Sequence, residues 1–217
     1  MKEIQPWGET LYTVLNGSHQ SFNTDRATVD LITNPYYGRM LFIDGVLQSA
    51  EIDEHIYHSE LASLVPQKGR ILIAGGAEGA LAKEVLSYAV DELVMVDWDE
   101  KLVNHMKGEI FAGYAFDDPR LTVIHMDILD YLAGSKTFDA ILLDLLDPKT
   151  DKDVEWLSKV ITLCLTKTKR LAVNAGGDIG KKNLLIDLLD PSLDITSKTI
   201  FVPSFQQEWY LMAIHKR

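Results

Sequence analysis

Apolar and polar positions follow two different patterns along this chain of 217 residues. Up to about residue 50, short alternating stretches such as 27–32 and 39–43 are separated by turn residues. One of these turns is Asp44-Gly45, a pair that favours a two-residue hairpin. We therefore expect residues 1–52 to form a small N-terminal domain built on an antiparallel sheet.

From residue 53 onward, helical and strand-like stretches alternate. A helical pattern begins at Asp53 and stops before Pro66. The pattern then predicts strands at 70–74, 93–97, 121–125, 138–144, 169–174, 195–202 and 207–214, and helices at about 79–89, 99–108, 128–133, 153–165 and 179–189. Because no helix separates the last two strands, the final strand should run antiparallel to its neighbours. Residues 53–217 are therefore predicted to form a doubly wound, Rossmann-like α/β sheet with helices on both faces.

A glycine-rich turn follows the first strand of this predicted sheet, in the stretch ILIAGGAEG at residues 71–79. Gly75, Gly76 and Gly79 let the backbone approach a bound nucleoside, and the helix start that follows supplies unpaired amide donors. About 20 residues later, the next apolar run ends in Asp97, where nucleotide-binding folds place the acid that binds the ribose hydroxyls. The two features together predict a nucleoside site, and the alternative is a compact strand-to-helix connection without a ligand.

Carboxylates follow the ends of four predicted strands, at Glu78, Asp97, Asp127 and Asp144, with Asp147 close behind. The carboxyl ends of parallel strands meet at the edge where such sheets bind ligands. An acidic rim would repel a pyrophosphate and attract a positively charged nucleoside or a polyamine. From the residues alone, Asp127 can equally cap the following helix, and Asp144 and Asp147 can be turn formers.

Composition narrows the class of protein. With 47% hydrophobic and 24% charged residues, the chain is typical of soluble proteins, and its formal net charge of −11 disfavours nucleic acid and anionic lipid as partners. No apolar run is long enough to span a membrane, and the N-terminal residues 1–6 lack the apolar core of a signal peptide, so we expect a cytoplasmic protein. Cys164 is the only cysteine, and His55 and His58 lack the HExxH pattern, so we expect neither a disulfide nor a bound metal. Trp98, Trp156 and Trp209 are expected to be core or interface aromatics.

Several motifs together resemble the polyamine aminopropyltransferases, the family typified by spermidine synthase. The similar segments are WGET at 7–10, YGRMLFIDGVLQ at 37–48, DEHIYHSE at 53–60, GGAEG at 75–79, VDWD at 96–99, DDPR at 117–120 and DLLDP at 144–148. These enzymes are usually dimers or tetramers with the N-terminal sheet at the interface. The resemblance therefore implies a homodimer that acts on small nucleoside and polyamine substrates.

The resemblance also implies how the donor, decarboxylated S-adenosylmethionine, would bind. Asp97 would hydrogen-bond the ribose hydroxyls, and Asp127 would contact the adenine. Glu78 and His58 would hold the aminopropyl arm, next to the glycine turn. Glu78 replaces the aspartate of the family pattern, which lengthens the side chain by one methylene.

On the acceptor side, the resemblance implies that Tyr57, Asp144 and Asp147 hold a diamine, with Asp144 as the base. The chain departs from the family pattern here: leucines fill the space between the two aspartates, and Lys149 follows them. Phe205 stands where the family has an acceptor-binding tyrosine, so a hydroxyl is lost. These departures leave the identity of the acceptor open.

The implied activity is transfer of the aminopropyl group from this donor to a diamine such as putrescine, with release of methylthioadenosine. One alternative is a methyltransferase that uses ordinary S-adenosylmethionine. Such enzymes usually carry an acid just before the glycines, where this chain has Ile73-Ala74, and Glu78 within the turn would repel the carboxylate of that cofactor. The other alternative is a catalytically silent relative that only binds a nucleoside or a partner.

Overall fold

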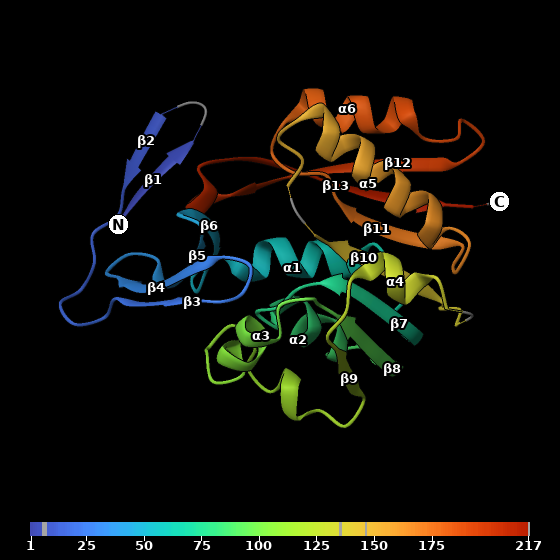
Figure 1. The fold of residues 1–217 in the computed structure, drawn as a ribbon. Coiled ribbons are helices and arrows are strands. Elements are labelled where there is room, and N and C mark those ends of the chain that lie inside the picture. Colours follow the sequence, from blue (N-terminus) through green and yellow to red (C-terminus); the bar gives the residue numbers. More distant parts are fainter. Residues whose placement is uncertain (6–7, 135, 146, 217) are drawn as a thin grey trace.

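The structure, a computed structural model, describes residues 1–5, 8–134, 136–145 and 147–216. Trp7 of the WGET motif and Leu146 of the DLLDP motif lie outside the described residues. The strands form three sheets with two, four and seven members in the described part of the chain. Figure 1 shows the two small sheets at the N-terminal side of the molecule, next to the large mixed α/β unit.

The N-terminal region is antiparallel, as predicted, but it is divided into two sheets. Strands β1 (Lys2–Gln5) and β2 (Gly8–Leu11) pair only with each other. The second sheet has the order β3 (Gln20–Asn23), β4 (Thr28–Asn34), β5 (Gly38–Ile43), β6 (Val46–Ala50). Asp44 and Gly45, between β5 and β6, have φ angles of 49° and 76°, and positive values at both positions are typical of a type I′ hairpin turn. The predicted hairpin is confirmed.

The large sheet has the order β12-β13-β11-β10-β7-β8-β9. Five of its strands are parallel: β7 (Lys68–Gly75), β8 (Ala89–Val96), β9 (Leu121–Ile124), β10 (Ala140–Asp144) and β11 (Arg170–Asn174). Strand β13 (Gln207–His215) runs antiparallel to both β11 and β12 (Asp194–Val202), as the missing helix between the last two strands predicted. The chain order reverses between β7 and β10, and doubly wound sheets bind their ligands at such a point.

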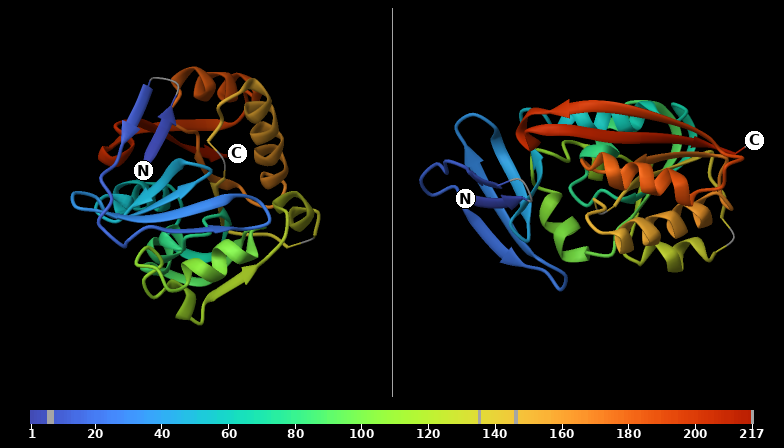
Figure 2. Two further views of the ribbon diagram at one scale, coloured as in Figure 1. Left: turned by 60° about the vertical axis from the view of Figure 1, so that its left-hand side comes forward. Right: turned by 90° about the horizontal axis from the view of Figure 1, so that it is seen from above.

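Helices cover both faces of this sheet, which confirms the predicted doubly wound fold (Figures 1 and 2). On one face, α1 (Glu54–Ser63), α2 (Ala80–Leu86) and α3 (Glu100–Met106) share an apolar core with the strands. On the other face, α4 (Ile128–Leu132), α5 (Asp151–Cys164) and α6 (Ile179–Leu188) form a second core. Two single 3₁₀ turns, η1 (Ala115–Asp117) and η2 (Pro203–Phe205), complete the elements. None of the helices in the described ranges is long and apolar enough to cross a membrane.

Candidate active site

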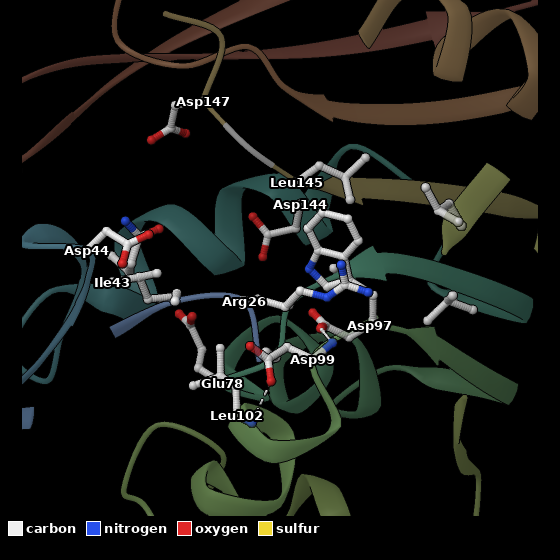
Figure 3. A pocket seen from close by; sticks show the side chains of 18 of the residues that line it. Arg26, Ile43, Asp44, Glu78, Asp97, Asp99, Leu102, Asp144, Leu145 and Asp147 are labelled. Carbon is white, nitrogen blue, oxygen red and sulfur yellow. Dashed lines mark hydrogen bonds between the residues drawn. The ribbon is translucent and has the colours of Figure 1, made fainter. Parts of the chain in front are cut away.

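A cavity of about 660 Å³ lies at the carboxyl ends of β7, β8 and β10, and the β5–β6 hairpin covers one side of it. Ten of the eleven predicted site residues line this cavity: Tyr57, His58, Gly75, Gly76, Glu78, Asp97, Asp127, Asp144, Asp147 and Phe205. Figure 3 shows the carboxylates of Glu78, Asp97 and Asp144 around a common space. Residues from widely separated segments therefore meet in one acidic pocket.

The glycine turn packs directly against the end of β10. Gly75 and Gly76 have φ angles of 85° and 77°, which side chains disfavour. A Cβ atom on Gly75 would lie 2.0 Å from the backbone oxygen of Asp144, so only glycine permits this close approach. The eleventh predicted residue, Gly79, does not line the cavity: it caps α2 with a φ angle of 81°, and a Cβ there would lie 2.7 Å from the ring of Phe116. Gly79 thus starts the helix and makes room for a neighbouring ring.

Tyr57 and Asp144 form a close pair inside the cavity. The Tyr57 hydroxyl donates a hydrogen bond of 2.5 Å to Oδ1 of Asp144. The pKa of Asp144 is raised to about 6. Burial is the main cause and the charges of Glu78 and Asp147 add to it, while the charge of His58 and the Tyr57 hydrogen bond lower the pKa. A carboxyl group with a pKa near the working pH is suited to act as a general base.

Asp147 is fixed by a hydrogen-bond network at the end of β11. It accepts a hydrogen bond of 2.9 Å from Nδ2 of Asn174, whose Oδ1 in turn accepts one of 2.8 Å from Nε1 of Trp209. Burial raises the pKa of Asp147. The ring of Phe205 lies 4.8 Å from that of Trp209 at an interplanar angle of 47°, and the two rings form an apolar wall of the cavity. Lys149 does not line this cavity; it lines an adjoining hollow of about 100 Å³ that shares Asp147 and Phe205.

At the other end of the cavity, Asp97 and Asp127 sit where their strands end. Asp97 accepts a hydrogen bond of 2.8 Å from the backbone of Asp99, and burial raises its pKa to about 6. Asp127 accepts a hydrogen bond of 2.8 Å from the backbone of Leu129, so it does cap α4 as one interpretation predicted. Asp127 also lines the cavity, so capping α4 does not exclude contact with a ligand.

Sequence reasoning missed Arg26, which lines the cavity (Figure 3). Its guanidinium lies 4.5 Å from the ring centre of Trp98. Trp98, expected as a core or interface aromatic, is 55% exposed and therefore does not lie in the core. Asp25, next to Arg26, forms an ion pair of 2.6 Å with Lys101 of α3. These contacts join the β3–β4 turn to Trp98 and to α3, and no local sequence motif predicts them. Within the described ranges, no group of three or more metal-ligating side chains is found.

Comparison with known proteins places these features in a family. Residues 50–175 match the family profile described as the spermine/spermidine synthase domain. A polyamine aminopropyltransferase of Saccharolobus islandicus is 42% identical over 132 residues, which are 57% of this chain and 44% of that protein. Polyamine aminopropyltransferase 2 of Pseudomonas aeruginosa is 42% identical over 126 residues, 54% of this chain and 36% of that protein. The aligned segment spans less than half the length of either relative.

Solved structures share the whole architecture. Spermidine synthase from Thermotoga maritima superposes with a TM-score of 0.87 at 21% identity, covering 100% of this chain and 79% of that chain. A spermidine synthase in complex with the transition state analogue AdoDATO gives the same TM-score and identity and covers 80% of that chain. These likenesses establish the fold, and the family profile covers more than half of the sequence. The chain therefore belongs to the spermine/spermidine synthase family.

Proposed function

We propose that this protein transfers the aminopropyl group of decarboxylated S-adenosylmethionine to a diamine such as putrescine and releases methylthioadenosine. The observation that carries the proposal is the single cavity that gathers Glu78, Asp97, Asp144 and Asp147. This donor carries a sulfonium and an ammonium, and the acceptor carries ammonium groups, so several carboxylates in one pocket complement both substrates. The family profile and the named activities of the relatives support the same class of reaction.

In this proposal, Asp97 binds the ribose and Asp127 the adenine, while Glu78 and His58 hold the arm of the donor. Glu78 would also select the donor. The carboxylate that ordinary S-adenosylmethionine retains would be repelled by an acid in the glycine turn, whereas the decarboxylated arm ends in an ammonium only. Glu78 would therefore repel the arm of ordinary S-adenosylmethionine and attract the arm of the decarboxylated donor.

Tyr57, Asp144 and Asp147 hold the acceptor in the proposed reaction. An alkylamine with a pKa of about 10.4 is neutral in roughly one molecule per thousand at pH 7.4, a penalty of about 4 kcal/mol for nucleophilic attack. Asp144 accepts the proton from the bound ammonium, which frees the nitrogen lone pair to attack the propyl carbon. The carbon–sulfur bond breaks, and sulfur keeps the electron pair as the neutral thioether of methylthioadenosine.

We also propose that the chain works in the cytoplasm as a homodimer, with residues 1–52 and 53–217 as its two domains. The net charge of −11 supports small cationic substrates rather than nucleic acid or anionic membranes as partners. The N-terminal sheets lie at one end of the molecule, where we place the contact with the second copy (Figure 2). Sedimentation analysis would measure the dimer directly.

Turnover of decarboxylated S-adenosylmethionine with putrescine, followed by release of methylthioadenosine, tests the proposed activity. Asp144→Asn should lower kcat by about 10²–10⁴-fold while methylthioadenosine still binds, because only the proton acceptor is lost. A fully active variant would remove Asp144 from the mechanism. Methyl transfer from ordinary S-adenosylmethionine would favour the methyltransferase alternative. Nucleoside binding without turnover on a diamine panel would favour the silent relative.

A further inference from the structure

A row of four ionisable side chains leads from helix α2 to the cavity wall. Nζ of Lys83 lies 2.5 Å from Oε1 of Glu54, and Oε2 of Glu54 lies 2.9 Å from Nδ1 of His58. Nε2 of His58 lies 3.2 Å from Oε1 of Glu78. The side chains of His58, Glu54 and Glu78 are only 3%, 8% and 13% exposed. Buried charges persist when each has a partner, and this row alternates in sign throughout.

Both ring nitrogens of His58 face groups that only accept hydrogen bonds. Nδ1 contacts the Glu54 carboxylate and, at 2.8 Å, the Glu54 backbone oxygen, while Nε2 contacts the Glu78 carboxylate. An ionised carboxylate has no proton to donate, so each ring nitrogen must carry one. Burial disfavours the charged ring, but the hydrogen bonds to Glu54 and Glu78 outweigh it and raise the pKa of His58 to about 10. His58 is therefore a fixed cation at neutral pH.

The charged and titratable groups that face His58 come from three surrounding segments: Glu54 and Tyr57 of α1, Glu78 of the glycine turn, and Asp144 at the end of β10. Lys83 of α2 stands behind Glu54. Of the two carboxylates bonded to the His58 ring, only Glu78 lines the cavity. His58 thus connects a pair outside the cavity lining, Lys83 and Glu54, to a carboxylate that faces the substrate.

We propose that Lys83 and Glu54 are positioning residues that act through His58 to orient Glu78 toward the aminopropyl arm of the donor. The inference rests on the proposed function, in which Glu78 binds the ammonium of that arm. If residue 54 lost its charge, a neutral imidazole that donates from Nδ1 would turn the lone pair of Nε2 toward Glu78 and repel it. Although burial opposes ionisation of Glu54, its hydrogen bonds to His58 and Lys83 lower its pKa and keep it charged.

Calorimetric titration of two ligands tests this role. Decarboxylated S-adenosylmethionine carries the charged arm, whereas methylthioadenosine has the same nucleoside without it. Glu54→Gln should weaken binding of the first ligand about tenfold and Lys83→Met about threefold, because a charge-assisted contact to the arm is misaligned. Binding of methylthioadenosine should change by less than about twofold. Equal losses for both ligands, or unchanged affinity for both, would overturn the proposal.

Lys198→Met is the matched control, because Lys198 pairs with Glu60 on the same helix α1 but neither residue lines the cavity. It should leave both affinities unchanged. If Glu54→Gln does not fold, Lys83→Met carries the test, because it retains the pair between Glu54 and His58.

Nitrogen NMR of His58 gives an independent readout that needs no ligand. Both ring nitrogens should stay protonated from about pH 6 to 9 in the unaltered protein, and one proton should be lost within that range in Glu54→Gln. A neutral ring in the unaltered protein would overturn the proposal. If the unaltered protein binds both ligands equally, the proposed function fails, while the NMR result still decides whether Glu54 sets the charge of His58.

Discussion

The hydrogen bond from Tyr57 to Asp144 allows the base to be perturbed by removing one oxygen atom. Tyr57→Phe deletes the hydroxyl that donates to Oδ1 of Asp144 at 2.5 Å. Hydrogen bonds to charged groups contribute about 1.5–3 kcal/mol, and each pKa unit corresponds to about 1.36 kcal/mol. Because this bond stabilises the ionised carboxylate, its loss should raise the pKa of Asp144 by about 1–2 units from its value of about 6.

The assay is the pH dependence of kcat/KM, whose acidic limb reports the base in the free enzyme. In Tyr57→Phe this limb should move up by about 1–2 pH units, so the loss of activity is large near pH 6 and shrinks toward pH 9. The control is Tyr210→Phe, since Tyr210 donates a hydrogen bond of 3.2 Å to Glu208 and neither residue lines the cavity. An acidic limb that stays in place in Tyr57→Phe would refute the assignment of Asp144 as the base held by this hydroxyl.

Two further predictions concern stability. Gly75→Ala should destabilise the fold by at least about 1–3 kcal/mol, because its φ angle is 85° and the new Cβ would meet the backbone of Asp144. Thermal melting checks this, with Gly108→Ala as the control because a Cβ at Gly108 would meet open space. Asp97→Asn should stabilise the protein at pH 7 by about 3 kcal/mol, because burial raises the folded pKa of Asp97 from 3.8 to about 6 and ionising it opposes folding. That gain should vanish below about pH 4, and a gain independent of pH would contradict the reasoning.

The fold could be predicted from the sequence because each of its signals is local. Periodicity separated strands from helices, the missing helix before residue 207 predicted the antiparallel last strand, and Asp44-Gly45 predicted a hairpin. The division of the N-terminal region into two sheets was not predicted, because pairing partners depend on how distant segments meet. The pattern of apolar and polar residues in β1 and β2 did not show that these strands stay separate from the four-stranded sheet.

The candidate site, like the fold, could be predicted from the sequence only in part. Acids at strand ends could be placed on one edge from the topology, and Asp97, Asp144 and Asp147 do line a common cavity. Contacts across the chain could not be read from spacing: Arg26 reaches Trp98 over more than 70 positions of sequence. The glycine motif predicted that Gly79 lies at the nucleoside site. In the structure Gly79 does not line the cavity, and a glycine is needed there because the ring of Phe116 lies close by.

We propose that carboxylates around one cavity select a nucleoside whose arm ends in a positive charge alone. Calorimetric titration of the unaltered protein with decarboxylated and ordinary S-adenosylmethionine tests it directly, because the two ligands differ only in one carboxylate. The decarboxylated ligand should bind at least about tenfold more tightly, since Glu78 repels the carboxylate of ordinary S-adenosylmethionine. Equal affinity, or tighter binding of ordinary S-adenosylmethionine, would contradict it.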